Sequence, residues 1–202
     1  MNYLLPAEYE AFGLDAETGD DLVQAASAMI DGFCRRPGLY VQQYTERLRF
    51  AQGGESVWLS HGPVVALVQV RVRLSRRGAM SAYRDALQQV ATVFGLYGSW
   101  TTVDVSTVEV SNTGEVRIAP NFFGVAYDEV GITYTAGWAA IPGAVKVACA
   151  QVVKNAQATP GLNVKKSQVG GGVDAMKMEY FSGALLGDET KRLLKPYVAV
   201  RL

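Results

Sequence analysis

The stretch ITYTAGWAAIPGAVKVA, residues 132–148, contains the change of pattern that decides the fold. Glu129–Thr135 is typical of a β-strand, because β-branched and aromatic residues dominate it. Gly137 then permits a tight turn, Trp138 can anchor that turn to a core, and Pro142 suits the first position of a helix. We therefore expect a strand, a turn and a helix in direct succession.

Two long helices are predicted from apolar residues that recur at i, i+3 and i+4. The first extends from about Thr18 to Cys34, and the second from Ile141–Pro142 to the stop signal at Thr159. Their apolar positions are Leu22, Ala25, Ala26, Met29, Ile30 and Phe33 in the first helix, and Val145, Ala148, Cys149, Val152, Val153 and Ala156 in the second. A short helix is expected from Asp188 to Lys195, followed by an extended segment.

Between the long helices the pattern changes to a period of two, which is typical of strands. The expected strands are residues 40–50, 56–59, 64–74, 102–110 and 115–118, and the last two form a hairpin around Asn112–Gly114. In residues 64–74 the set Val68, Val70, Val72 and Leu74 alternates with polar residues and is expected to be buried. Residues 80–94 fit a helix better than a strand, and further strands are expected at 164–169 and 175–181.

The pattern as a whole predicts an α+β protein with one domain, residues 1–202. A small helical core of two or three long helices carries a β-rich insertion, residues 40–128, between the core helices. Residues 187–202 form an extended C-terminal arm.

The composition is that of a folded protein, with 49% apolar and 19% charged residues. No apolar run approaches the roughly 18 residues of a membrane span, and no signal peptide is evident, so we expect a cytoplasmic protein without a membrane partner. Cys34 and Cys149 have no CxxC partner, and His61 is the single histidine. We therefore expect no metal site.

Charge is distributed unevenly along the chain, although its net value is zero. That net value argues against a dedicated nucleic-acid binder. Residues 1–34 carry acidic side chains and no lysine or arginine, whereas residues 35–84 carry nine arginines and two glutamates. The two blocks are either solvated faces that neutralise each other within one subunit, or complementary surfaces of neighbouring subunits in a ring.

No group of residues has the pattern of a catalytic site. Ser60 and His61 are adjacent on a turn, where neighbouring side chains rarely point at one another. Gly170–Gly172 lacks the lysine and hydroxyl residue of a phosphate loop, and the paired carboxylates at 20–21 and 188–189 fit helix caps. We expect no enzyme activity, no catalytic residue and no cofactor.

Three stretches resemble the head-to-tail connector, or adaptor, proteins of long-tailed bacteriophages and related gene-transfer particles. The strongest is Ile132–Ala148, with its strand, Ala-Gly-aromatic turn and proline-started helix. Asp20–Asp31 is similar to the family's first helix. Val164–Gly170 is similar to the loop after the second core helix, although Gln168 stands where an acidic residue is more usual. The β-rich middle is longer than in compact members of the family.

The resemblance implies a structural, non-enzymatic virion protein of the phage neck, assembled in the host cytoplasm. Copies would form a ring, of twelve subunits in that family, which joins the portal to the next head-completion or tail protein and lets DNA pass without specific binding. The portal-docking candidates in the C-terminal arm are Lys191, Arg192, Leu193, Leu194, Lys195, Tyr197, Val198 and Val200. The candidate DNA-channel or inter-subunit charges are Arg71, Arg73, Arg76 and Arg77, for which a solvated strand face is the plainer explanation.

Two alternatives stay open. One is another neck or tail structural protein, such as a tail-completion or terminator subunit. The other is a small enzyme or ligand-binding module without a recognisable motif.

Overall fold

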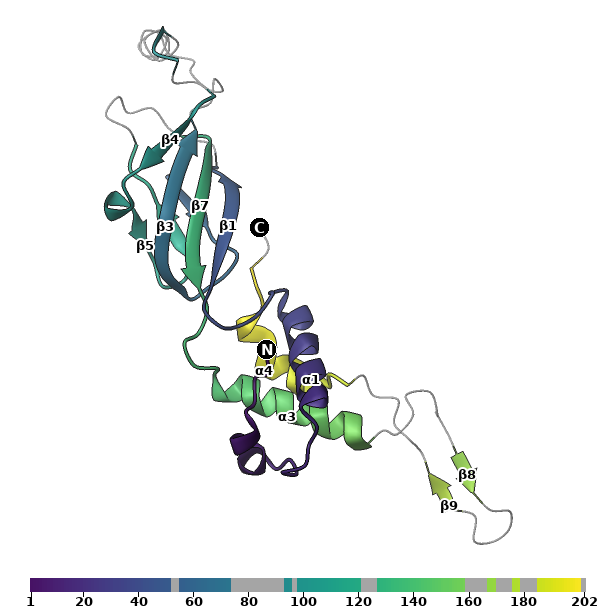
Figure 1. Ribbon diagram of the computed structural model, residues 1–202. Coiled ribbons are helices and arrows are strands. Elements are labelled where there is room, and N and C mark those ends of the chain that lie inside the picture. Colours follow the sequence, from purple (N-terminus) through teal and green to yellow (C-terminus); the bar gives the residue numbers. More distant parts are fainter. Residues whose placement is uncertain are drawn as a thin grey trace. The chain divides into compact units, whose positions relative to one another are not determined.

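The computed structural model describes residues 1–51, 55–73, 93–95, 98–120, 127–158, 167–169, 176–178 and 185–200 (Figure 1). The chain divides into two compact units. The helical unit contains Met1–Leu39 and Ala140–Val198, and the sheet unit contains Tyr40–Ala139 and Ala199–Leu202. The expected α+β class, with a β-rich region between helices, is confirmed.

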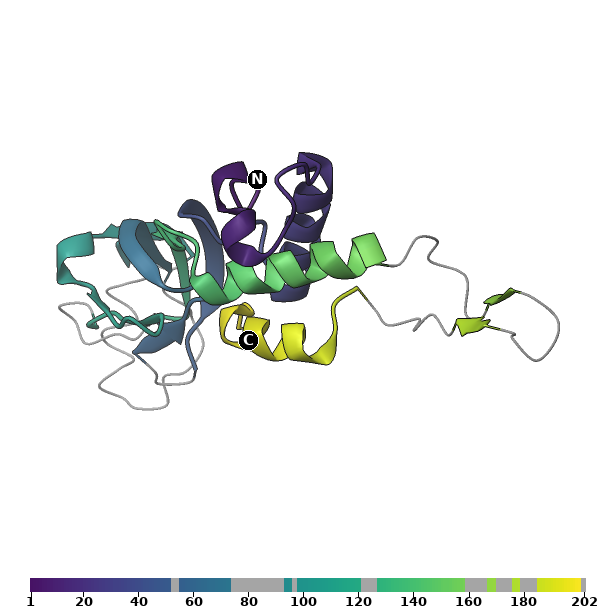
Figure 2. The same ribbon diagram turned by 90° about the horizontal axis from the view of Figure 1, so that it is seen from below.

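The helical unit is built on α3 (Gly143–Ala158), which contacts both α1 (Asp20–Cys34) and α4 (Asp188–Leu194). Figure 2 shows α3 between the other two helices. A helix covered on two sides must be apolar over more than one face, and each buried valine contributes about 1.5–3 kcal/mol. The buried residues of α3 are Val145, Ala148, Cys149, Ala150, Val152 and Val153.

The buried face of α1 differs from the predicted stripe. Ala25 is exposed, and Val23 and Ser27 are buried instead. The reason is local hydrogen bonding: Ser27 Oγ donates to the Val23 carbonyl at 2.7 Å and accepts from Tyr3 N at 3.1 Å. A serine that is satisfied in this way can occupy a core position, which rotates the buried face by about one residue. The prediction for the α3 stripe is confirmed at every position except the half-buried Ala156.

The N-terminal segment covers α1 and α3 with two 3-10 turns, η1 (Pro6–Glu8) and η2 (Glu10–Phe12). Tyr3 and Tyr9 are buried and donate their hydroxyls to Asp31 and Asp20 of α1. The α3 residue Lys146 pairs with Glu8. These bonds fasten the segment to both helices.

The sheet unit has two antiparallel sheets. The four-stranded sheet has the order β1 (Gln42–Arg49), β7 (Glu129–Ala136), β3 (Val64–Arg73), β4 (Trp100–Val103). The three-stranded sheet has the order β2 (Ser56–Trp58), β6 (Glu115–Arg117), β5 (Glu109–Val110). One core cluster joins them, with residues such as Val72 and Ile132 from the larger sheet and Val57 and Val116 from the smaller. Outside the sheet unit, β8 (Ser167–Val169) and β9 (Met176–Met178) form a two-stranded antiparallel sheet.

The expected burial of β3 is wrong at Val68, which is 51% exposed, while Val70 and Val72 are buried as predicted. The register between β3 and β7 shifts twice, between Val64 and Ala66 and between Leu67 and Gln69. Each irregularity changes which side chains face the core, so simple alternation fails in this half of the strand.

The expected strand at residues 102–110 is also wrong, because the chain changes sheets there. The Asp104 side chain accepts a hydrogen bond from Ser106 N at 2.9 Å and caps the turn η3 (Val105–Thr107). The chain before the turn pairs with β3, and the chain after it forms the expected hairpin with β6. The helix predicted at residues 80–94 lies, apart from Val93 and Phe94, outside the described residues, as do Leu74, Arg76 and Arg77.

Candidate interaction surface

The turn after β7 requires glycine. Gly137 has a φ of 130°, and a Cβ atom there would overlap the Tyr40 carbonyl. Gly137 N donates to the Pro63 carbonyl at 3.0 Å, and Trp138 forms a bridge with Tyr40. In the helical unit, the Pro142 carbonyl accepts from Val145 N at 3.0 Å, so α3 begins directly after the proline. The conformation of Gly137 and the position of Pro142 agree with the sequence reasoning, whereas the expected anchoring role of Trp138, which is half-buried, stays a prediction.

The expected short C-terminal helix is confirmed as α4, but the extended arm expected after it begins with a 3-10 turn. Thr190 and Leu194 of α4 are buried in the helical unit, and η4 (Lys195–Tyr197) follows α4. Within the sheet unit, Val200 N donates to the Ser60 carbonyl at 3.1 Å. Among the docking candidates, Arg192, Leu193, Lys195 and Val200 are exposed, Lys191, Tyr197 and Val198 are half-buried, and Leu194 is fully buried. Apolar residues of this segment therefore pack on their own subunit.

Charged side chains gather on the outer face of the four-stranded sheet, the face turned away from the core. We call this surface the arginine platform; it consists of Arg47, Arg49, Arg71, Arg73, Trp100 and Glu129. The strand register brings it together, because Glu129 lies between Arg49 and Arg73 across the sheet. In the next outward-facing row, Gly131 lies between Arg47 and Arg71.

Glu129 organises the platform. Its side chain is 4% exposed and accepts hydrogen bonds from Arg47 Nε at 3.1 Å and Arg49 Nε at 3.2 Å, with Arg73 Nη1 at 3.8 Å. The hydrogen bonds from Arg47 are the main cause that lowers the pKa of Glu129 from its ordinary value. One carboxylate cannot neutralise four guanidinium groups, so the platform keeps an excess of positive charge.

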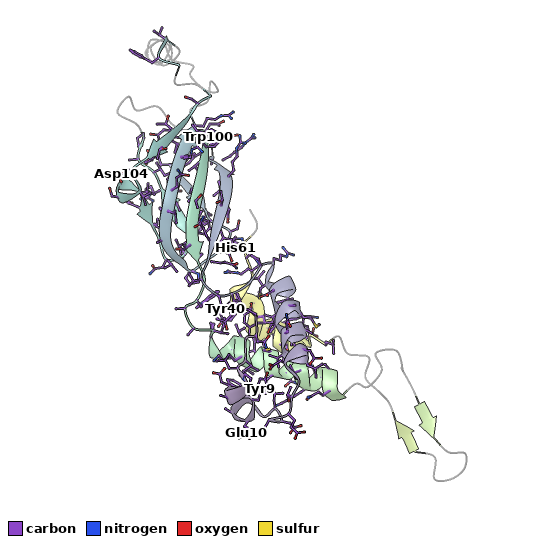
Figure 3. All side chains as sticks on the ribbon, viewed as in Figure 1. Tyr9, Glu10, Tyr40, His61, Trp100 and Asp104 are labelled. Carbon is purple, nitrogen blue, oxygen red and sulfur yellow. The ribbon has the colours of Figure 1, made fainter. Side chains whose placement is uncertain are left out.

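Trp100, labelled in Figure 3, lies over Gly131: a Cβ atom on that glycine would be 3.7 Å from the Trp100 ring. The guanidinium carbons of Arg47, Arg71 and Arg73 are 5.3, 5.9 and 6.0 Å from the ring centroid. These distances suit cation–π attraction, which favours a fixed orientation of the guanidinium planes. Sequence reasoning singled out Arg71 and Arg73 but found no aromatic residue among the arginines. Only the pairing of β4 with β3 brings Trp100 to them.

A second carboxylate, Glu46, faces inward on β1. It accepts hydrogen bonds from Tyr134 Oη, from Ser60 N at 3.1 Å and from Ser60 Oγ at 3.0 Å. The His61 ring stacks on Tyr44 with centroids 4.0 Å apart. Burial, together with the bond to Glu46, raises the pKa of Tyr134. The Ser60 hydroxyl is thus directed at a carboxylate, and the cluster has the character of a packing network.

Both cysteines are buried in the helical unit, and burial raises the pKa of each thiol to about 11. Thiols with so little thiolate are weak nucleophiles at neutral pH. Within the described ranges, no group of three or more potential metal ligands is found. No described helix is long and apolar enough to cross a membrane.

The helical unit has an acidic hollow, lined by Asp15, Ala16, Glu17, Thr18, Gly19, Leu22 and Gln157. Asp15 and Glu17 are exposed at its rim, whereas Leu22 is half-buried. Thr18 is 7% exposed, and its Oγ1 has no hydrogen-bond partner among the residues that the structure describes. A buried hydroxyl without a partner is rare.

No family model and no curated protein matches the chain. One similar solved structure is described as the neck of an empty GTA (gene transfer agent) particle computed with C6 symmetry. The TM-score is 0.49 at 16% sequence identity, and the likeness covers 99% of this chain and 91% of that chain. These values establish neither a family nor a role for this chain.

Proposed function

We propose that this chain is a structural protein of the neck of a tailed-phage-like particle. Copies of it form a ring between the portal and the next head-completion or tail protein, and DNA passes through the ring without specific recognition. The chain acts by docking and has no catalytic role. Its working location is the virion, after assembly in the host cytoplasm.

The observation that carries the proposal is the strand–turn–helix motif of residues 132–148, on which the resemblance to connector proteins rests. The motif is demanding, because a glycine with positive φ must follow β7 and α3 must begin after Pro142. Both requirements are met by the residue types that the resemblance specifies.

The portal contact is assigned to the exposed part of the C-terminal segment, namely Arg192, Leu193, Lys195 and Val200. Deleting residues 187–202 is a poor test, because the deletion removes the buried Thr190 and Leu194 from the helical unit. Point substitutions test the contact better. Arg192→Ala with Lys195→Ala is expected to lower co-purification with the portal while the helical far-UV signal stays unchanged. Arg35→Ala, at another exposed arginine, serves as the matched control.

The neck assignment is tested in a particle-producing strain that lacks the chain. Heads and tails are expected to accumulate separately, and the supplied protein is expected to join them and to appear at the neck by immunogold labelling. Joined particles made without the chain, or purified particles that do not contain it, contradict the proposal.

A further inference from the structure

We propose that the arginine platform binds the acidic hollow of a second copy of this chain. The sheet unit of one subunit thereby docks on the helical unit of the next. This inference deepens the proposed function, because it names the contact that builds the ring. A contact between two different surfaces is heterologous, and repeated heterologous contacts close into rings when the rotation allows it.

The platform is accessible and carries uncancelled charge. The side chains of Arg47 and Arg49 are 60% and 76% exposed, and that of Arg73 is 36% exposed. Arg71 is exposed as well and lies over Trp100. Tryptophan and arginine are the residues most enriched at the energetic centres of protein interfaces.

The arginine side chains are also preorganised. Glu129 holds Arg47 and Arg49 by hydrogen bonds, and Trp100 lies beneath the guanidinium groups of Arg71 and Arg73. Arginine loses considerable rotamer entropy when it is fixed at an interface. Because these contacts already restrict the side chains, less entropy remains to be lost on binding.

The acidic hollow has the complementary chemistry. Asp15 and Glu17 have no ion pair among the described residues, whereas Glu8 is paired with Lys146. The hollow also offers the half-buried Leu22 as an apolar surface. Exposed carboxylates beside a half-buried leucine are chemically complementary to a tryptophan surrounded by guanidinium groups. Residues 1–34 contain no lysine or arginine that would oppose this approach.

A carboxylate partner fits the platform better than nucleic acid does. Glu129 shows that the guanidinium groups already bind a carboxylate in this arrangement. The chain has no net positive charge to attract a polyanion, and its first 34 residues repel one. Nucleic acid is therefore the competing occupant that the experiment must separate.

The test reverses each surface in the full-length chain. Arg49→Glu with Arg71→Glu reverses the platform and leaves Arg47 and Arg73 to neutralise Glu129. Asp15→Lys with Glu17→Lys reverses the rim of the hollow. Sedimentation velocity over a concentration series at low ionic strength measures self-association, and tryptophan fluorescence and far-UV circular dichroism verify the fold.

Each reversed variant alone is expected to lose at least roughly tenfold in association constant, because attraction becomes repulsion. An equimolar mixture of the two variants is expected to regain association, and so is one chain that carries all four substitutions. High salt is expected to weaken wild-type association, since the Debye length falls from about 10 Å at 0.1 M to about 3 Å at 1 M. If the platform reversal unfolds the sheet unit, Arg49→Gln with Arg71→Gln replaces it, with a smaller expected loss.

Failure of the mixture to associate overturns the inference, as does a wild-type chain that stays monomeric at low salt. Fluorescence anisotropy with a double-stranded oligonucleotide tests the competing occupant. If platform reversal abolishes oligonucleotide binding and leaves self-association unchanged, nucleic acid is the occupant of the platform. A failed contact in a chain that still occupies the neck contradicts this inference alone. Absence from the particle contradicts the proposed function instead.

Discussion

Two glutamates on neighbouring strands of one sheet are stabilised in different ways. Glu129 on β7 faces outward and is held by arginines, whereas Glu46 on β1 faces inward and is held by hydroxyl and backbone donors. Cationic donors leave a charged surface that remains available to a partner. Neutral donors use the hydrogen-bonding capacity of the carboxylate inside the subunit. The surroundings of Glu129 therefore suit interaction with a partner, whereas those of Glu46 stabilise the subunit itself.

The largest expected effect is from Glu46→Ala. The substitution removes the acceptor of Ser60 N, Ser60 Oγ and Tyr134 Oη, and each poorly solvated donor costs about 1–3 kcal/mol. We expect the sheet unit to lose about 3 kcal/mol of unfolding free energy. All three tryptophans, Trp58, Trp100 and Trp138, belong to the sheet unit, so tryptophan fluorescence in urea measures this loss. The exposed Glu109→Ala is the control, and an equal loss there refutes the assignment.

Tyr134→Phe removes one donor from the same network and keeps the buried ring. It also removes the acceptor of His61 N, at 3.3 Å. We expect a loss of about 1–2 kcal/mol, smaller than for Glu46→Ala and not additive with it, because both changes act on one bond. A double-mutant cycle that gives full additivity shows that the two residues act independently.

Glu129→Gln is expected to destabilise the sheet unit by only about 1 kcal/mol, because the arginines that it releases are largely exposed. The informative difference is the response to salt. Without the carboxylate, the repulsion between arginines is uncompensated, so added salt should stabilise this variant. Glu46→Gln should show no such response, and a shared salt dependence contradicts the comparison.

The smallest effect concerns pH. The pKa of Glu129 is lowered in the folded state, so its contribution is fully present above the ordinary glutamate pKa and is lost as pH falls through the lowered value. Wild-type stability should therefore decline in acid more steeply than that of Glu129→Gln. Parallel acid titration curves of the two proteins show that the arginine contacts do not stabilise the carboxylate.

Much of the fold follows from local sequence. The α3 stripe, the hairpin around Asn112–Gly114 and the turn at Gly137 each depend on residues close together in the chain. Propensity, capping and backbone conformation act over that range, so these elements could be predicted. Ser27 and the shifts in β3 could not, because a hydrogen bond or register shift elsewhere decides which side chain faces the core.

The sequence by itself determined the two long helices, most of the described strands, the α+β class and the separation of acidic and basic blocks along the chain. The tertiary structure alone decided that β7 lies between β1 and β3, and that β4 flanks β3. Alternation indicates that Arg71 and Arg73 share a face, but it carries no information about which strand lies beside them. The contact of Glu129 with Arg47 joins residues 82 positions apart. Such pairings depend on how the whole sheet buries its core. A local sequence pattern contains no information about that arrangement.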